Sequence, residues 1–140
     1  MSHILQISEA AALGIHACVI IAGSGEKCTT PHIAEVLCAS QAHLSKVMRQ
    51  LVVAGLVESV RGPGGGFVLA RDSAEISLLD IYQAIDGPFP SQTCLFRKRV
   101  CGGSKCILGD FLDRTNNEAR DYFANTTLGD IIDHRDGKRD

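Results

Sequence analysis

The sequence of 140 residues lacks the features that mark several large classes of protein. No apolar run approaches the ~20 residues of a membrane span. The N-terminal MSHILQISEA has neither the basic region nor the cleavage site of a secretory signal, so we expect a soluble, cytoplasmic protein without a membrane partner. No nucleophile–base pair appears, and the glycine-rich run 62–66 lacks the lysine and following helix of a phosphate-binding loop. The sequence therefore predicts that the protein is not an enzyme.

The sequence also has little net charge, −2 at pH 7, which taken alone argues against a nucleic-acid partner. The distribution of charge argues the opposite. Residues 40–71 carry four basic residues against Glu58 alone, and residues 94–106 carry four basic residues and no acid. The first basic island contains Lys46, Arg49, Arg61 and Arg71, and the second contains Arg97, Lys98, Arg99 and Lys105. The local positive charge of these islands, rather than the net charge of the chain, governs how strongly a polyanion is attracted.

Disulfide bonds are not expected either, because six cysteines in a reducing compartment do not indicate a disulfide scaffold. With 45% apolar and 21% charged residues, a chain of this length buries a core without cross-links. Cys94, Cys101 and Cys106 lie within thirteen residues, a density typical of metal ligands. The other three cysteines are scattered along the chain. Cys18 and Cys38 are expected to act as small core hydrophobes, and Cys28 is assigned no role.

Capping residues and apolar periodicity predict a mainly α-helical protein with one small β-hairpin. The expected helices span 10–22, 31–38, 40–54, 78–86, 107–124 and a short segment from 128. The first is apolar all round and belongs in the interior, and Thr30 is expected to cap the second. Ser77 with Asp80, and Thr127 with Asp130, are expected to cap the fourth helix and the short last one. Two short β-compatible runs, 56–60 and 67–70, flank a Gly/Pro loop and predict the hairpin.

The helix expected at 40–54 has two different faces. Its buried stripe follows the i, i+3, i+4, i+7 spacing through Leu44, Val47, Met48 and Leu51. The opposite face is small and basic, and it carries Ala42, Ser45, Lys46 and Arg49, with Gln41 and His43 near the start. Such a helix can enter the ~12 Å major groove of DNA, and a glycine-rich hairpin loop with one arginine can approach the minor groove. Three helices followed by a hairpin is the order of a winged helix-turn-helix.

The wing carries a family resemblance. Arg61-Gly62-Pro63-Gly64-Gly65-Gly66-Phe67, directly after the third helix and Leu56-Val57, strongly resembles the Rrf-type family of bacterial regulators, which includes IscR-like and NsrR-like members. The opening Ile7-Ser8-Glu9-Ala10-Ala11-Ala12-Leu13, the segment 77–87 and the cysteine loop are similar to that family too, so the resemblance covers about residues 5–125. It implies a homodimeric transcription regulator that binds a near-palindromic double-stranded DNA operator. By position it implies DNA contacts from Gln41, His43, Ser45, Lys46, Arg49, Arg61, Pro63 and Gly64.

The cysteine loop, Cys94-x6-Cys101-x4-Cys106, supplies three thiols among basic residues. Thiolates are soft ligands that suit iron–sulfur clusters, zinc or copper(I), and basic neighbours offset the charge of a thiolate-ligated cluster. A structural zinc site requires a fourth cysteine or histidine nearby, and neither follows. Among these options the resemblance implies a [2Fe–2S] or [4Fe–4S] cluster held by the three cysteines.

The fourth ligand of such a cluster is less obvious. In the IscR branch a histidine three residues after the third cysteine completes the site, whereas this chain has Gly109 there. In the NsrR branch an acidic residue from the partner's N-terminal region serves, which by position implies Glu9. The alternative for Glu9 is a glutamate favoured by the dipole of the first helical turn. Lesser candidates are His3, His32 and Asp110.

The sequence predicts three segments: a winged helix-turn-helix DNA-binding domain at 1–87, a cluster-binding loop at 88–106, and a dimerisation helix with a C-terminal segment at 107–132. The apolar stripe of the last long helix can also be internal core. It follows a complete winged-helix core, however, and this favours pairing with a second copy.

The expected function is a DNA-binding transcription regulator, a repressor, that senses iron–sulfur status, nitric oxide or redox stress. One rival is a metal-free regulator that senses oxidants through its thiols. Another is a small iron–sulfur electron-transfer protein whose basic islands dock an acidic partner, which leaves the wing unexplained. The alternative to a DNA-binding role is that Lys46 and Arg49 belong to an ordinary solvated helix face and that Arg61 only keeps a surface turn soluble.

Overall fold

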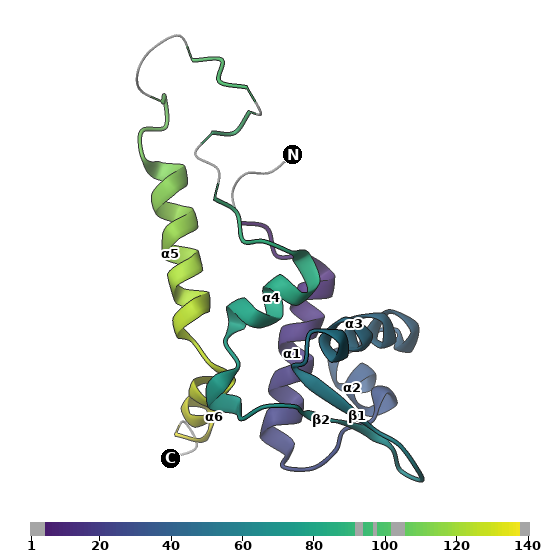
Figure 1. The fold of residues 1–140 in the computed structure, drawn as a ribbon. Coiled ribbons are helices and arrows are strands. Elements are labelled where there is room, and N and C mark those ends of the chain that lie inside the picture. The colour runs from purple at the N-terminus through teal and green to yellow at the C-terminus, as the bar shows by residue number, and fades with distance from the viewer. Residues whose placement is uncertain (1–4, 92–93, 97, 102–105, 138–140) are drawn as a thin grey trace.

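The computed structural model describes residues 5–91, 94–96, 98–101 and 106–137 (Figure 1). Its helices are α1 (Glu9–Ser24), α2 (Thr30–Leu37), α3 (Gln41–Val53), α4 (Leu78–Asp86), α5 (Phe111–Asn125) and α6 (Leu128–Asp136), with a 3-10 turn at Ser73–Glu75. Strands β1 (Val57–Val60) and β2 (Gly66–Leu69) form an antiparallel hairpin. The predicted mainly α-helical fold with a small hairpin wing is confirmed. Within the described ranges, no helix has the length and apolar character needed to cross a membrane.

Helix α1 is the central element against which α2, α3, α4 and α6 pack. Ser8 caps its N-terminus, where the hydroxyl oxygen accepts a hydrogen bond from the N–H of Ala11 at 3.0 Å. The helix begins one residue earlier and ends two residues later than predicted. Cys18 is fully buried in its middle, as expected, and burial raises the pKa of this thiol to about 12. The thiol therefore stays protonated and behaves as an apolar side chain.

Helices α2 and α3 form the helix-turn-helix. The cap of α2 is Thr29, whose hydroxyl oxygen accepts from the N–H of His32 at 3.3 Å, so the prediction that Thr30 is the cap is wrong by one residue. In the turn that follows, Cys38 takes a left-handed backbone conformation with φ of 52°. The prediction that Cys38 is a core residue is wrong, because this turn lies on the surface and leaves the residue exposed.

The buried stripe of α3 is the one that its periodicity predicts. Leu44, Met48 and Leu51 are completely buried, and Val47 is 1% exposed. They pack in one apolar core with α1 side chains such as Ile21. At about 25 cal/mol per Å² of apolar surface, each such side chain contributes about 1.5–3 kcal/mol of transfer free energy. This packing fixes which face of α3 remains outside.

The hairpin is joined to the loop before α2. Strand β1 pairs with β2 in the register Val57↔Leu69 to Val60↔Gly66. Cys28 forms an additional antiparallel bridge with Phe67, in which each residue donates its N–H to the carbonyl oxygen of the other, at 3.0 and 2.8 Å. Cys28, to which the sequence assigned no role, is 4% exposed and belongs to the core. The wing is therefore anchored to the α1–α2 connection.

Two capping boxes hold the C-terminal half together. Ser77 and Asp80 cap α4 reciprocally, and Thr127 and Asp130 do the same for α6, as the sequence predicts. Both caps meet in one backbone bridge between Ser77 and Thr127. The exposed Asp130 carboxylate accepts a hydrogen bond from the N–H of Thr127 at 2.9 Å, and this bond is the main cause that lowers the pKa of Asp130. The end of the chain is thereby attached to the winged-helix core.

Helix α5 begins at Phe111 rather than at 107, because residues 107–110 form turns and Gly109 has a left-handed φ of 61°. One face of the helix is internal, where the ring of Phe123 packs against Tyr82 and Phe89 at centroid distances of 6.0 and 5.7 Å. On the outer side of the helix two large apolar side chains are uncovered, with Phe111 48% and Tyr122 62% exposed. The predicted stripe is thus part core and part exposed surface.

Candidate nucleic-acid interface and cysteine loop

The outer face of α3 presents the small and basic side chains that the sequence predicts there. Gln41, Ser45, Lys46 and Arg49 are exposed, and His43 is half-buried. Ser40 caps the helix by accepting a hydrogen bond from the N–H of His43 at 3.1 Å. The cap fixes the start of α3, so Ser45 and Lys46 follow within its first two turns. This face has the size and charge to enter a major groove.

The wing turn exposes a single arginine on a narrow backbone. Arg61, Pro63 and Gly64 are all exposed, and the N–H of Gly65 donates to the carbonyl oxygen of Gly62 at 2.9 Å to close the turn. Gly64 has a φ of 69°, a conformation that L side chains rarely adopt. The turn is therefore narrow and carries its charge at the start.

Gly66 is required for a different reason, the closeness of another backbone segment. A β-carbon at this position would lie 2.6 Å from the carbonyl oxygen of Cys28 and 2.8 Å from its carbonyl carbon. Those are main-chain atoms held by the bridge to Phe67, so they cannot rotate away. The glycine-rich motif thus serves both the turn and its attachment to the core.

The two predicted DNA-contacting elements lie on the same side of the molecule. In Figure 1, α2, α3 and the hairpin are on one side of α1, whereas α5 is on the other. A side that presents an exposed basic helix and a glycine-rich wing is suited to a polyanionic duplex.

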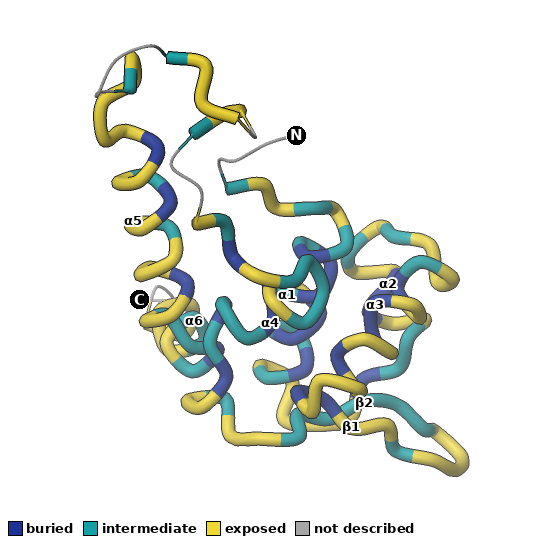
Figure 2. The backbone as a smooth tube through the Cα atoms, turned by 45° about the horizontal axis from the view of Figure 1, so that its top comes forward, coloured by how far each residue is buried: buried dark blue, intermediate teal, exposed yellow. Residues whose placement is uncertain are grey.

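The cysteine loop lies between α4 and α5 and rises away from the helical body (Figure 1). Cys94, Cys101 and Cys106 are half-buried, and Figure 2 shows much of the intervening described chain as exposed. The N–H of Leu108 donates to the sulfur of Cys106 at 3.4 Å. Among the residues that the structure describes, no three side chains of His, Cys, Asp or Glu come together as metal ligands.

The remaining predicted residues are those of the second basic island and the candidate fourth ligands. Arg97 and Lys105 of the second basic island, and the candidate ligand His3, lie outside the described residues. Asp110 forms an exposed ion pair with Arg114, with an Nε–Oδ1 distance of 3.6 Å. Glu9 is exposed in the first turn of α1.

The chain before α1 is tied to the helices that flank the cysteine loop, a feature that sequence reasoning missed. Ser8 donates both its N–H, at 3.1 Å, and its hydroxyl to the carboxylate of Asp86 at the end of α4. The hydroxyl of Tyr82 donates to the carbonyl oxygen of Gln6 at 3.2 Å. Burial, and to a lesser degree the nearby Asp86, raise the pKa of Tyr82. Glu9 is therefore held close to the residue at which the loop begins.

The same tie extends to α5. The N–H of Leu5 donates to the side-chain oxygen of Asn116 at 3.1 Å, across 111 residues of sequence. Asn116 is a buried polar residue, 2% exposed, in the middle of α5. No local pattern marks this pairing, because its two groups are brought together only by the packing of α4 and α5.

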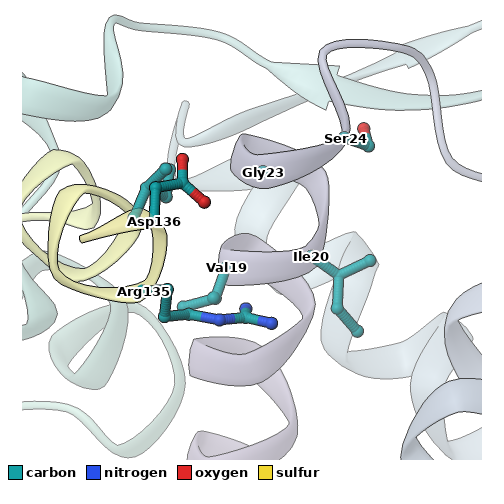
Figure 3. Close-up of a pocket in the computed structure, with 7 residues that line it drawn as sticks. Val19, Ile20, Gly23, Ser24, Arg135 and Asp136 are labelled. Carbon is teal, nitrogen blue, oxygen red and sulfur yellow. The ribbon is translucent and has the colours of Figure 1, made fainter. Parts of the chain in front are cut away.

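A small cavity of about 250 Å³ lies between α1 and α6 (Figure 3). Its α1 wall contains Val19, Ile20 and Gly23, and its α6 wall contains Arg135 and Asp136. None of the predicted DNA-contacting or cluster-binding residues lines it. The cavity is therefore separate from both candidate sites.

A helix-turn-helix with an exposed basic second helix, followed by a glycine-rich wing, defines the class of winged helix-turn-helix transcription regulators. The model of the Rrf2 family, described as "Iron-dependent Transcriptional regulator", matches residues 7–134. The chain belongs to this family. It is a transcription regulator and not an enzyme.

Individual relatives and a solved structure that resemble this chain are also regulators. The chain is 34% identical over 103 residues to an HTH-type transcriptional regulator of Neisseria meningitidis serogroup A, a match that covers 71% of this chain and 70% of that relative. It is 29% identical over 97 residues to IscR of Escherichia coli, covering 69% of this chain and 60% of IscR. The solved structure of CymR, the global cysteine regulator of B. subtilis, superimposes with a TM-score of 0.79 at 25% identity, covering 94% of this chain and 98% of CymR.

Proposed function

We propose that this regulator binds an operator in double-stranded DNA as a homodimer, and that a cluster on its loop cysteines controls the binding. The observation that carries the DNA-binding half is the exposed basic face of α3 on the same side of α1 as the exposed Arg61 of the wing. In this proposal α3 reads the major groove through Gln41, His43, Ser45, Lys46 and Arg49. The wing enters the minor groove through Arg61, Pro63 and Gly64.

Replacing Arg61 or Lys46 by alanine is expected to weaken binding to duplex DNA, because each substitution removes a cation from the proposed surface. Affinity should fall by roughly tenfold, about 1.4 kcal/mol. Each lost phosphate contact should also reduce the slope of log K against log salt by about 0.9. Fluorescence anisotropy at several salt concentrations measures both, with a duplex of about 30 base pairs, three helical turns, selected by the wild-type chain from a random pool.

The matched control is Arg120→Ala, which removes the same charge from an exposed position on α5, on the other side of α1. This variant should bind the selected duplex with the wild-type affinity and salt slope. If Arg61→Ala and Lys46→Ala also behave like the wild type, α3 and the wing are not the DNA-binding surface.

The sensing half rests on the donor chemistry of the loop. Cys94, Cys101 and Cys106 provide three soft ligands on one connection outside the helices. Exposed Lys98 and Arg99 lie in the same loop and offset the negative charge of thiolates. The donor set suits an iron–sulfur cluster, and the description of the family as iron-dependent supports this choice. Such a cluster supplies a group that iron supply, oxidants or nitric oxide can alter.

Glu9 is the proposed fourth ligand, contributed by the N-terminal region of the partner chain. Glu9 is exposed at the first turn of α1, so its carboxylate is accessible to the cysteine loop of a second chain. Because α1 also packs against α3, a ligand at its first turn would link the state of the loop to the position of the reading helix.

The proposed dimer surface is the outer side of α5 together with the turn before it. Phe111 and Tyr122 of the helix are exposed, as are Leu108 and Ile107 of the turn, and Ile107 is 86% exposed. An apolar face of this kind is typically covered by a partner. A twofold dimer would also place two copies of α3 about one DNA turn apart.

Cys94, Cys101 and Cys106 are free, partly exposed thiols, and this also supports a second candidate, a regulator that senses oxidants through its thiols. The two candidates share the DNA-binding surface and differ in iron content. Iron and sulfide analysis of protein purified without oxygen decides between them.

A further inference from the structure

The connection between α1 and α2 brings a second cation to the wing. Cys28 is bridged to Phe67 by two backbone hydrogen bonds and points into the core. Side chains alternate in direction along an extended segment, so the preceding residue, Lys27, faces away from the core. Lys27 is exposed.

The ammonium group of Lys27 lies against the tip of the wing. A β-carbon built on Gly64 would be 3.7 Å from Nζ and 3.9 Å from Cε of Lys27. Gly64 has no side chain, and the lysine therefore lies next to the backbone of the turn. The predicted wing, read from residues 61–67 alone, does not include this residue, which is distant in sequence.

The charge of Lys27 is available to a ligand. Throughout the ranges that the structure describes, no ion pair joins Lys27 or Arg61 to a carboxylate. The backbone of the preceding residue, Glu26, is held by Ser24: the Glu26 N–H donates to the Ser24 hydroxyl at 3.2 Å, and the Glu26 carbonyl oxygen accepts from that hydroxyl at 2.6 Å. The wing turn therefore presents two cations, one from each of two segments.

The geometry points to Lys27 as a further DNA-binding residue, one that contacts a backbone phosphate at the edge of the groove entered by the wing. This inference rests on the proposed function. A lysine ammonium is a point charge on a flexible stem, which suits a phosphate oxygen better than the fixed pattern of a base edge. Lys27 should therefore strengthen binding to all duplexes without selecting among sequences.

Lys27→Ala is expected to lower affinity by roughly three- to tenfold and to reduce the salt slope by about 0.9 per chain. The loss should be equal on the selected duplex and on a scrambled duplex of the same composition. Lys27→Arg, which keeps the charge, should retain the wild-type slope. Thermal unfolding of both variants should match the wild type, because the side chain is exposed.

Arg61→Ala is measured beside them to separate the two proposals. A wild-type affinity and slope for Lys27→Ala, together with weakened binding by Arg61→Ala, would overturn the role of Lys27 and leave the interface standing. Wild-type behaviour of both variants would overturn the interface itself. A loss in Lys27→Ala that is restricted to the selected duplex and leaves the salt slope unchanged would also overturn the phosphate contact.

Discussion

Protein in which Cys101 is replaced by alanine is expected to contain no iron–sulfur cluster, whereas the wild-type chain purified without oxygen should contain iron and inorganic sulfide. In the proposed site each loop cysteine supplies one of three thiolates, and a cluster left with two would have too few protein ligands to persist. Cys94→Ala and Cys106→Ala should behave in the same way. Iron and sulfide analysis and the visible absorption spectrum measure the result.

The control is Cys38→Ala, because Cys38 is an exposed cysteine in the helix-turn-helix rather than in the loop. Cys18→Ala tests a buried cysteine whose thiol stays protonated and is therefore no ligand. Both variants should retain full iron. Full iron in Cys101→Ala would remove the loop from the site, and iron-free wild-type protein that still binds DNA would favour the thiol-based sensor.

Glu9→Ala belongs to the same experiment and has a different expected result. The three thiolates should still hold iron, but the spectrum and the reactivity toward oxygen or nitric oxide should change, because a carboxylate ligand has been lost. The apo-dimer and the helix content should be unaffected, since Ser8 supplies the cap of α1. An unchanged spectrum and reactivity would leave Glu9 with only the ordinary role of an acid in a first helical turn.

Gly66→Ala should destabilise the attachment of the wing to the core. The new β-carbon would lie 2.6 Å from the carbonyl oxygen of Cys28, and relief requires breaking the paired hydrogen bonds between Cys28 and Phe67. We expect a loss of roughly 2–4 kcal/mol in the free energy of unfolding. DNA binding should also weaken, because Lys27 and the wing turn would lose their common anchor.

The same substitution at Gly23 is the control. Gly23 lies in the last turn of α1, and a β-carbon there would meet nothing within 4 Å. Gly23→Ala should leave stability unchanged or raise it by about 0.5–1 kcal/mol, since alanine is the better helix former. Urea unfolding followed by circular dichroism compares the two. Equal midpoints for Gly66→Ala and Gly23→Ala would contradict the close approach of the two backbones.

Elements whose signals are local can be predicted from the order of the residues alone. The spacing of Leu44, Met48 and Leu51 predicts the buried face of α3, and with it the exposed face that carries Lys46. Reciprocal capping residues predict the starts of α4 and α6. These signals act within one or two helical turns, so they can be read without knowing the rest of the fold.

Features that join distant segments depend on how those segments pack, and they can be seen only in the folded protein. The exposure of Cys38 depends on a left-handed turn between two packed helices, and no periodicity reports it. The hydrogen bond from Leu5 to Asn116 and the approach of Lys27 to Gly64 bring together residues far apart in the chain. Such contacts exist only after the apolar faces have packed, because that packing sets the position of each backbone relative to the others. The apolar periodicity of one helix shows which of its faces is buried, but it does not show which other segment packs against that face.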